Sequence, residues 1–217
     1  MITFDLETLQ TTDEEVIESF RKSIKAPANY SKPETIAKWH ENCAQALADM
    51  VAKTSFDGLY GSIACIAWAS NDGAIFASDA NHSEREVIEL FYSFIDHEKN
   101  VDKFCGHNLA GFDLPFLKHR SIILGIQPPA KLWQAMNAKP WDSCIADTML
   151  LWSSDSQKRA SMDKLCKAFG IKGKEGFDGS MVNNEWVNGD RSKVIEYCKD
   201  DVRRTIEIYN RITFLGK

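Results

Sequence analysis

Two carboxylates lie two residues apart in the first apolar segment of the chain, at Asp5 and Glu7. Residues 2–6 alternate in polarity and are rich in β-forming types, so we expect a strand there. Side chains at positions i and i+2 of a strand point to the same face. Two carboxylates on one face of an otherwise apolar strand are costly unless a cation meets them. The pair therefore suggests a divalent-metal site, although two solvated acids on an edge strand would give the same pattern.

A second cluster follows a short predicted strand at 103–106 and contains His107, Asn108, Phe112 and Asp113. Ligand sites of α/β sheets gather at such carboxyl ends of strands. Asn108 offers both a donor and an acceptor to a sugar or phosphate, and the Phe112 ring can stack on a base. The competing interpretation is that Asn108 caps a turn and Phe112 belongs to the core.

The third cluster lies in a helix predicted from about residue 192 to 215. Tyr197 and Asp201 are four residues apart and share one face of this helix, whereas Asp200 is expected to face solvent. A phenol one turn from a metal-ligating carboxylate can hydrogen-bond a water on that metal. The simpler alternative is a tyrosine at the boundary between helix and sheet, beside an ion-paired aspartate.

Hydrolysis of a phosphodiester with two divalent cations needs several carboxylates converging on one point. Asp5, Glu7, Asp113 and Asp201 supply them from three distant segments. In this order the motifs resemble the DEDD superfamily of 3′–5′ exonucleases, and most of all a stand-alone form of the proofreading-type exonuclease domain of family B DNA polymerases. Tyr197, four residues before Asp201, makes the third motif resemble that of the DEDDy branch. The resemblance extends from residue 2 to about 213.

The resemblance implies hydrolysis with two divalent cations, Mg²⁺ or Mn²⁺. Asp5 would bridge both ions, Glu7 and Asp201 would ligate the ion on the nucleophile side, and Asp113 would hold the second ion. Tyr197 would orient the attacking water. The products would be nucleoside 5′-monophosphates released from the 3′ end of single-stranded or frayed DNA.

Residues beside these motifs are candidate substrate contacts: Thr8, Leu9, His107, Asn108, Phe112 and Lys174. Lys174 belongs to a glycine-rich loop at 170–179, and a basic run at 118–120 is a further candidate for phosphate binding. The alternative for both basic segments is a solvated surface.

Capping signals and periodicity predict the elements that position these residues. Thr12 opens a capping box, and Pro33 stands at the first position of a longer polar helix that ends near residue 53. Further strands are expected at 60–70 and 74–78, joined by a hairpin turn at 71–73, and helices at about 83–97, 112–124, 143–152 and 162–169.

This order predicts an α/β fold with an RNase H-like mixed five-stranded sheet flanked by helices. An N-terminal helical insertion would occupy about residues 10–56. At 217 residues we expect a single exonuclease domain covering 1–217.

Composition excludes several other classes of protein. The net charge of −5 argues against a nucleic-acid coat protein, but not against a nuclease whose carboxylates bind cations. The six cysteines form no C-x-x-C pair, which favours buried thiols in a reducing compartment. We find no secretory leader and no apolar run of the roughly 20 residues that span a bilayer, so we expect a cytoplasmic enzyme without membrane contact.

The expected partner is therefore nucleic acid, most of all the 3′ end of single-stranded DNA. Since no polymerase region follows the last predicted helix, proofreading would require a polymerase in trans. Two alternatives stay open. One is an exoribonuclease of the same fold that trims RNA, because the distinction depends on a pocket around the 2′-hydroxyl. The other is a non-catalytic subunit that binds nucleic acid, although the complete set of carboxylates argues against it.

Overall fold

The computed structural model describes residues 1–25, 33–70, 73–153, 158–173 and 176–215. Lys174 and the first two residues of the expected hairpin turn lie outside the described residues.

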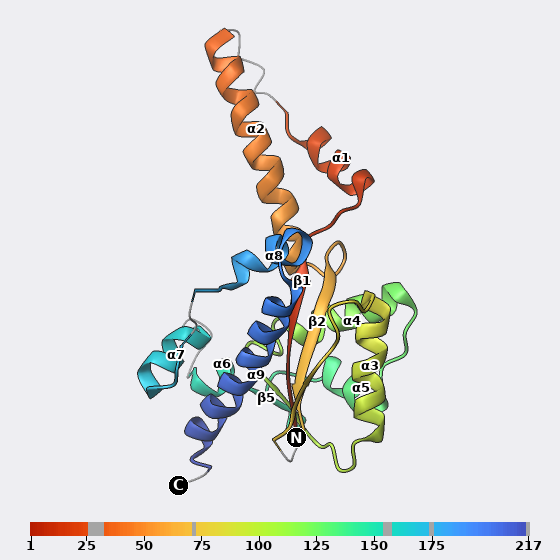
Figure 1. The fold of residues 1–217 in the computed structure, drawn as a ribbon, viewed down its shortest axis with the longest axis vertical. Coiled ribbons are helices and arrows are strands. Elements are labelled where there is room, and N and C mark those ends of the chain that lie inside the picture. The colour runs from red at the N-terminus through yellow and green to blue at the C-terminus, as the bar shows by residue number, and fades with distance from the viewer. Residues whose placement is uncertain (26–32, 71–72, 154–157, 174–175, 216–217) are drawn as a thin grey trace.

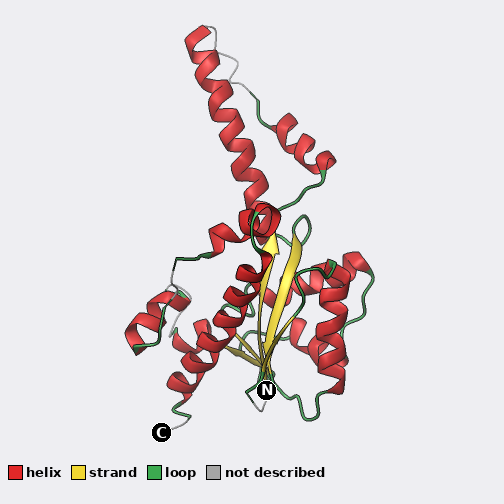
Figure 2. Ribbon diagram, viewed as in Figure 1, coloured by secondary structure: helices red, strands yellow, loops and turns green. Residues whose placement is uncertain are grey.

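A five-stranded sheet in the order β3-β2-β1-β4-β5 forms the centre of the molecule (Figure 2). Its central strand β1 pairs antiparallel with β2 and parallel with β4, while β3 and β5 extend the two edges. The expected mixed sheet of five strands is confirmed. The strands are β1 Ile2–Leu9, β2 Ser62–Ala69, β3 Ile75–Ala77, β4 Phe104–Gly106 and β5 Ile145–Asp147.

Helices cover both faces of this sheet (Figure 1). On one side lie α3, α4 and α5, and on the other lie α6, α7, α8 and α9. The helices are α1 Glu14–Ser23, α2 Pro33–Lys53, α3 Glu84–His97, α4 Asp113–Leu124, α5 Ala130–Met136, α6 Thr148–Trp152, α7 Met162–Phe169, α8 Val182–Asn188 and α9 Arg191–Thr213, with 3-10 turns η1 Thr54–Phe56 and η2 Gly179–Met181.

Successive side chains of β1 and β2 point to opposite faces of the sheet, so a separate core forms on each face. Phe4 and Leu6 pack in the large core beneath α3 and α4. The opposite face of β2 carries small residues, among them Cys65 and Ala67, which pack with α8 and α9. In the β-ladder Cys65 pairs with Glu7, and Ala67 pairs with Asp5. Small side chains on β2 therefore let α9 lie close to the strand that carries the two carboxylates.

Some expected boundaries were wrong. Helix α1 begins after Asp13, whose carboxylate accepts from two backbone N–H groups, one residue later than the predicted cap at Thr12. The expected helix at 143–152 is instead strand β5 followed directly by α6. The pattern of a short apolar run is compatible with a helix or with a strand. Here hydrogen bonding to β4 makes residues 145–147 a strand. Helices α5 and α8 were not predicted.

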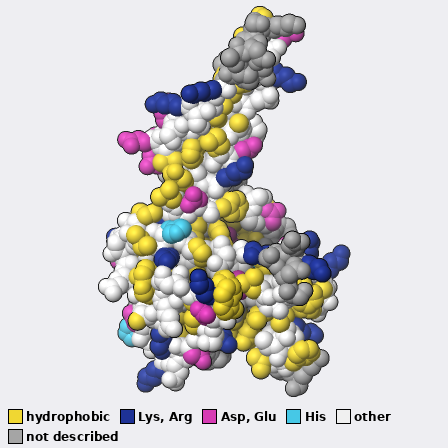
Figure 3. Space-filling view, turned by 180° about the vertical axis from the view of Figure 1, so that it is seen from behind, with side chains coloured by type: hydrophobic (Ala, Val, Ile, Leu, Met, Phe, Trp, Pro, Cys, Tyr) yellow, Lys and Arg dark blue, Asp and Glu magenta, His cyan; other side chains and the backbone are white. Residues whose placement is uncertain are grey.

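The helices α1 and α2 extend away from the sheet as an arm (Figure 1). The chain leaves and re-enters the body at neighbouring points, since the Thr11 N–H donates to Thr54 Oγ1 at 2.8 Å. A second bond, from Thr8 Oγ1 to the Ser55 carbonyl at 2.6 Å, holds η1 on the end of β1. Apolar side chains are visible along the arm in Figure 3.

Within the described part of the chain, no helix is both long and apolar enough to cross a membrane. The cysteines are free thiols, and four of the six are buried, as expected for small core residues.

Candidate active site

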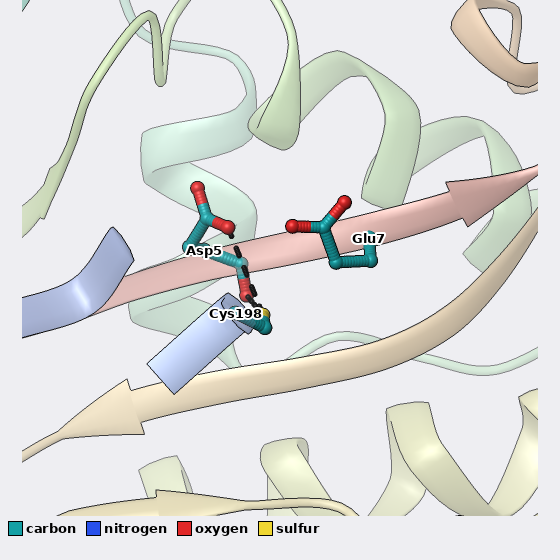
Figure 4. A group of neighbouring side chains, drawn as sticks. All are labelled: Asp5, Glu7 and Cys198. Carbon is teal, nitrogen blue, oxygen red and sulfur yellow. Dashed lines mark hydrogen bonds between the residues drawn. The ribbon is translucent and has the colours of Figure 1, made fainter. Parts of the chain in front are cut away.

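Asp5 and Glu7 lie side by side on the face of β1 that α9 covers (Figure 4). Together with Cys198 of α9 they offer three possible ligand atoms, all within 4.8 Å of one another. The Cys198 thiol donates toward Asp5, with Sγ at 3.3 Å from the backbone oxygen and 3.7 Å from Oδ2. The two carboxylates lie on one face of the strand, as the spacing predicted. Cys198 is a further neighbour, which the sequence indicated only as a buried thiol.

Asp113 reaches the same region from the first turn of α4. Its side chain is buried, with 3% of the residue exposed. Burial raises the pKa of its carboxyl well above the usual range, and the negative charges of Asp5 and Asp147 raise that pKa further. Hydrogen bonds from backbone groups, including Leu6, lower the pKa but only partly offset this rise. The protonated form of Asp113 is therefore favoured until a cation offsets the neighbouring charge.

Tyr197 and Asp201 approach from α9, and both are buried. Burial raises the pKa of the Tyr197 phenol far above its usual value, and the charges of Asp201, Glu7 and Asp5 raise it further. The phenol thus keeps its proton at all physiological pH values. The Tyr197 ring also packs on Phe177, with centroids 4.9 Å apart.

This donor set fits divalent cations. Carboxylate oxygens are the ligands that Mg²⁺ and Mn²⁺ prefer, and the repulsion between Asp113 and Asp5 is one that a cation would relieve. Cys198 fits such ions less well, because burial raises the pKa of its thiol well above the usual range and keeps the sulfur protonated. The carboxylates of Asp5, Glu7, Asp113 and Asp201 are therefore the candidate ligands.

Asn108 shapes the turn between β4 and α4. It has a positive φ of 64°, and its N–H donates to Asp147 Oδ1 at 3.0 Å. Its carbonyl accepts from the N–H groups of Gly111 and Phe112. Its side chain lies so close to Gly111 that a Cβ there would come within 2.5 Å of Oδ1. These contacts give Asn108 the turn-forming role, and they set Asp113 at the start of α4.

Asp147 completes the support of this turn. Its second carboxylate oxygen accepts from the Ala110 N–H at 3.0 Å, and its first also caps α6. These bonds give Asp147 a structural role. His107 is anchored in the same region, with Nδ1 2.9 Å from Thr148 Oγ1.

Phe112 is partly buried at the edge of the large core and has an exposed aromatic neighbour. The ring of Phe56, on η1, lies 6.3 Å from that of Phe112 and is 73% exposed. The sequence assigned no function to residues 10–56, so Phe56 was not among the candidate residues. No local pattern marks it, because its position depends on the contact between η1 and β1.

The basic run at 118–120 is largely engaged within the protein. Lys118 Nζ donates to Asn137 Oδ1 at 2.6 Å and lies over the Trp133 ring. Arg120 forms a two-pronged ion pair with Glu84, at 2.8 and 2.9 Å. Arg120 therefore holds α4 to α3. These contacts give no support to the prediction that it binds phosphate.

The family of the chain follows from its similarity to known proteins. A family model described as "Predicted 3'-5' exonuclease related to the exonuclease domain of PolB" matches residues 60–216, a stretch that contains Asp113, Tyr197 and Asp201. No protein with a curated description matches the chain significantly.

Among solved structures, the family B DNA polymerase from the hyperthermophilic archaeon Pyrobaculum calidifontis is similar, with a TM-score of 0.61 and 18% sequence identity. The match covers 98% of this chain and 24% of the polymerase, so the chain spans about a quarter of that protein's length. At this identity the similarity concerns the fold, which is the RNase H-like fold of such exonuclease domains.

Proposed function

Since this chain belongs to the family of predicted 3'-5' exonucleases related to the exonuclease domain of PolB, we propose that it removes nucleoside 5′-monophosphates from the 3′ end of single-stranded or frayed DNA. The observation that carries the proposal is the approach of carboxylates from β1, α4 and α9 to one region. Tyr197, four residues before Asp201, supports a place in the DEDDy branch. Residues 1–217 would form one such domain, with the arm as its helical elaboration.

Asp5, Glu7, Asp113 and Asp201 would hold two divalent cations, Mg²⁺ or Mn²⁺. When bound, these ions supply Lewis-acid activation of water and stabilise negative charge on the departing 3′ oxygen. Tyr197 donates its O–H to the attacking water and orients it. It does not act as a base, because the raised pKa of its phenol keeps it protonated.

The substrate is held beside this site by residues at the ends of β1 and β4. Phe112, with the exposed Phe56 next to it, stacks on unpaired bases, a contact that tolerates any sequence but requires an unstacked end. Thr8, Leu9, His107 and Asn108 line the backbone of the bound strand, and Lys174 pairs with a phosphate. If the enzyme proofreads, it acts on the product of a polymerase in trans.

The test is degradation of a 5′-labelled single-stranded DNA and a matched RNA in Mg²⁺, Mn²⁺ or EDTA. We expect a metal-dependent ladder that shortens from the 3′ end and is strongest for DNA. Asp201→Asn should abolish it, whereas Asp200→Asn, at the half-exposed neighbour that pairs with Arg203, should not.

Degradation of the RNA but not of the DNA would show that RNA, rather than DNA, is the substrate. Intact substrates in every condition, with binding retained, would indicate a non-catalytic subunit and overturn the proposal.

A further inference from the structure

Arg204 is a buried cation within the carboxylate cluster of α9. The residue is 8% exposed, and its Nη1 donates to Asp201 Oδ1 at 2.7 Å. Its Nη2 lies 3.9 Å from Oδ2 of Asp200. A charge-assisted bond at this distance, between two side chains that are each 9% exposed, is among the stronger kinds of hydrogen bond in a protein.

The spacing on α9 places this guanidinium next to the proposed chemistry. Tyr197, Asp201 and Arg204 follow one another at intervals of four and three residues, so they form one stripe along the helix. Tyr197 and Arg204 also line the same cavity of about 400 Å³, together with Phe177. Arg204 is therefore close enough to act on the site through Asp201.

We propose that Arg204 is a positioning residue, which orients Asp201 as a cation ligand; this inference rests on the exonuclease function proposed above. The guanidinium holds Oδ1 and fixes the plane of the carboxylate. With the carboxylate held in this plane, Asp201 would ligate the cation in a fixed orientation. Partners of this kind, which hydrogen-bond a ligating side chain, typically change metal affinity or activity by about 10- to 100-fold when they are lost.

A competing role for the same contact is that of a substitute cation, which occupies Asp201 and opposes metal binding. The two roles predict opposite signs. Removal of a positive charge strengthens cation binding through Coulomb's law. Loss of orientation weakens it. A neutral side chain at position 204 therefore separates the two roles.

The decisive experiment is calorimetric titration of Mn²⁺ into Arg204→Met, Arg204→Lys and the wild type. We expect Arg204→Met to bind Mn²⁺ about tenfold more weakly. Arg204→Lys, whose ammonium can still donate to Asp201, should recover to within about threefold of the wild type. Equal or tighter binding by Arg204→Met would overturn the proposal.

Arg203→Met is the matched control. Arg203 is the next residue, is 44% exposed and pairs with Asp200 and Glu196 on the surface. Its Mn²⁺ affinity should stay within about twofold of the wild type. A loss equal to that of Arg204→Met would mean that any arginine near the site has the same effect, and would overturn the assignment.

Steady-state kinetics give a second readout. Arg204→Met should lower kcat by about 10- to 100-fold and leave KM for DNA nearly unchanged. A higher KM with an unchanged kcat would place Arg204 on the substrate and overturn the positioning role. Should Arg204→Met fail to fold, Arg204→Gln, which is too short to hold Asp201, must bind Mn²⁺ at least threefold more weakly, and wild-type affinity in that variant would overturn the proposal.

The Mn²⁺ titration needs no turnover, so the two proposals fail separately. If the wild type leaves nucleic acid intact but Arg204→Met still weakens Mn²⁺ binding, the exonuclease function falls and the positioning role stands. If the wild type degrades DNA and Arg204→Met binds Mn²⁺ normally, the positioning role falls alone.

Discussion

At the scale of single residues, burial of the Asp113 carboxyl carries a cost in stability. The pKa of its carboxyl is raised in the folded protein, so the folded state holds this proton to a higher pH than the unfolded state does. Stability therefore falls as pH rises from the unfolded pKa toward the folded one, and the full penalty applies above the folded pKa.

Asp113→Asn should remove this penalty, because the amide carries no charge and keeps an oxygen for the Leu6 N–H. We expect the variant to be more stable than the wild type at pH 8 in EDTA, with a smaller gain at pH 5, and to be inactive. Urea denaturation at both pH values measures it. Asp200→Asn is the control, and a variant less stable than the wild type at pH 8 would contradict the raised pKa.

The carboxylates should also make stability depend on metal. A cation that binds only the folded state stabilises it by mass action. We expect Mg²⁺ or Mn²⁺ to raise the melting temperature of the wild type, and Asp5→Ala combined with Asp201→Ala to abolish most of that rise. The double variant Asp142→Ala, Asp200→Ala changes the same number of acids away from the proposed ligands. Scanning calorimetry with and without metal measures the melting temperatures. An equal metal-induced rise in melting temperature in both double variants would refute the proposed set of ligands.

At the scale of elements, α3 depends on a capping box. Ser83 Oγ accepts from the Glu86 N–H, and the Glu86 carboxylate accepts from the Ser83 N–H at 2.7 Å. Ser83→Ala should lower the free energy of unfolding by about 1 kcal/mol, with activity unchanged. Ser93→Ala, at an exposed position within the same helix, should be close to neutral in urea denaturation. Equal effects of the two changes would show that the cap contributes nothing.

Elements with explicit end signals were predicted well, and those defined by tertiary contacts were not. Pro33 and Ser83 marked the starts of α2 and α3 correctly. The strand Ile145–Asp147 has only three residues, and pairing with β4 rather than local preference makes it a strand. Site residues divide in the same way. Spacing within the motifs predicted the carboxylates as ligands. Arg204 and Phe56 were not predicted, because they enter the proposals only through their contacts with Asp201 and Phe112.

At the scale of the whole molecule, the arm is joined to the body mainly where its chain begins and ends, and the Phe20 ring of α1 also packs on Tyr60, with centroids 5.8 Å apart. No described residue of α1 is buried, and Thr11 and Thr54 are joined by a hydrogen bond where the arm begins and ends. Replacement of residues 12–53 by a short Gly-Ser linker should therefore leave the sheet and its proposed site folded. We expect a cooperative transition whose Tm falls by less than about 5 °C, with exonuclease activity on short single strands retained.

Circular dichroism and the labelled-DNA assay measure both outcomes. The control inserts the same linker between residues 53 and 54 of the full chain, which keeps the arm. A truncated protein that aggregates or melts without cooperativity would show that the arm supports the fold.

The contact between β1 and α9 joins the first strand to the last helix of the chain, with Asp5 on one and Asp201 on the other. Contacts this distant in sequence close late, because the intervening chain must be ordered first. On a translating ribosome, β1 emerges long before α9 exists. Unfinished chains therefore expose the Cys65 and Ala67 face of the sheet to chaperones and to other nascent chains. The proposed set of carboxylates stays incomplete until α9 has been synthesised, so a chain that stops before α9 should lack the proposed activity.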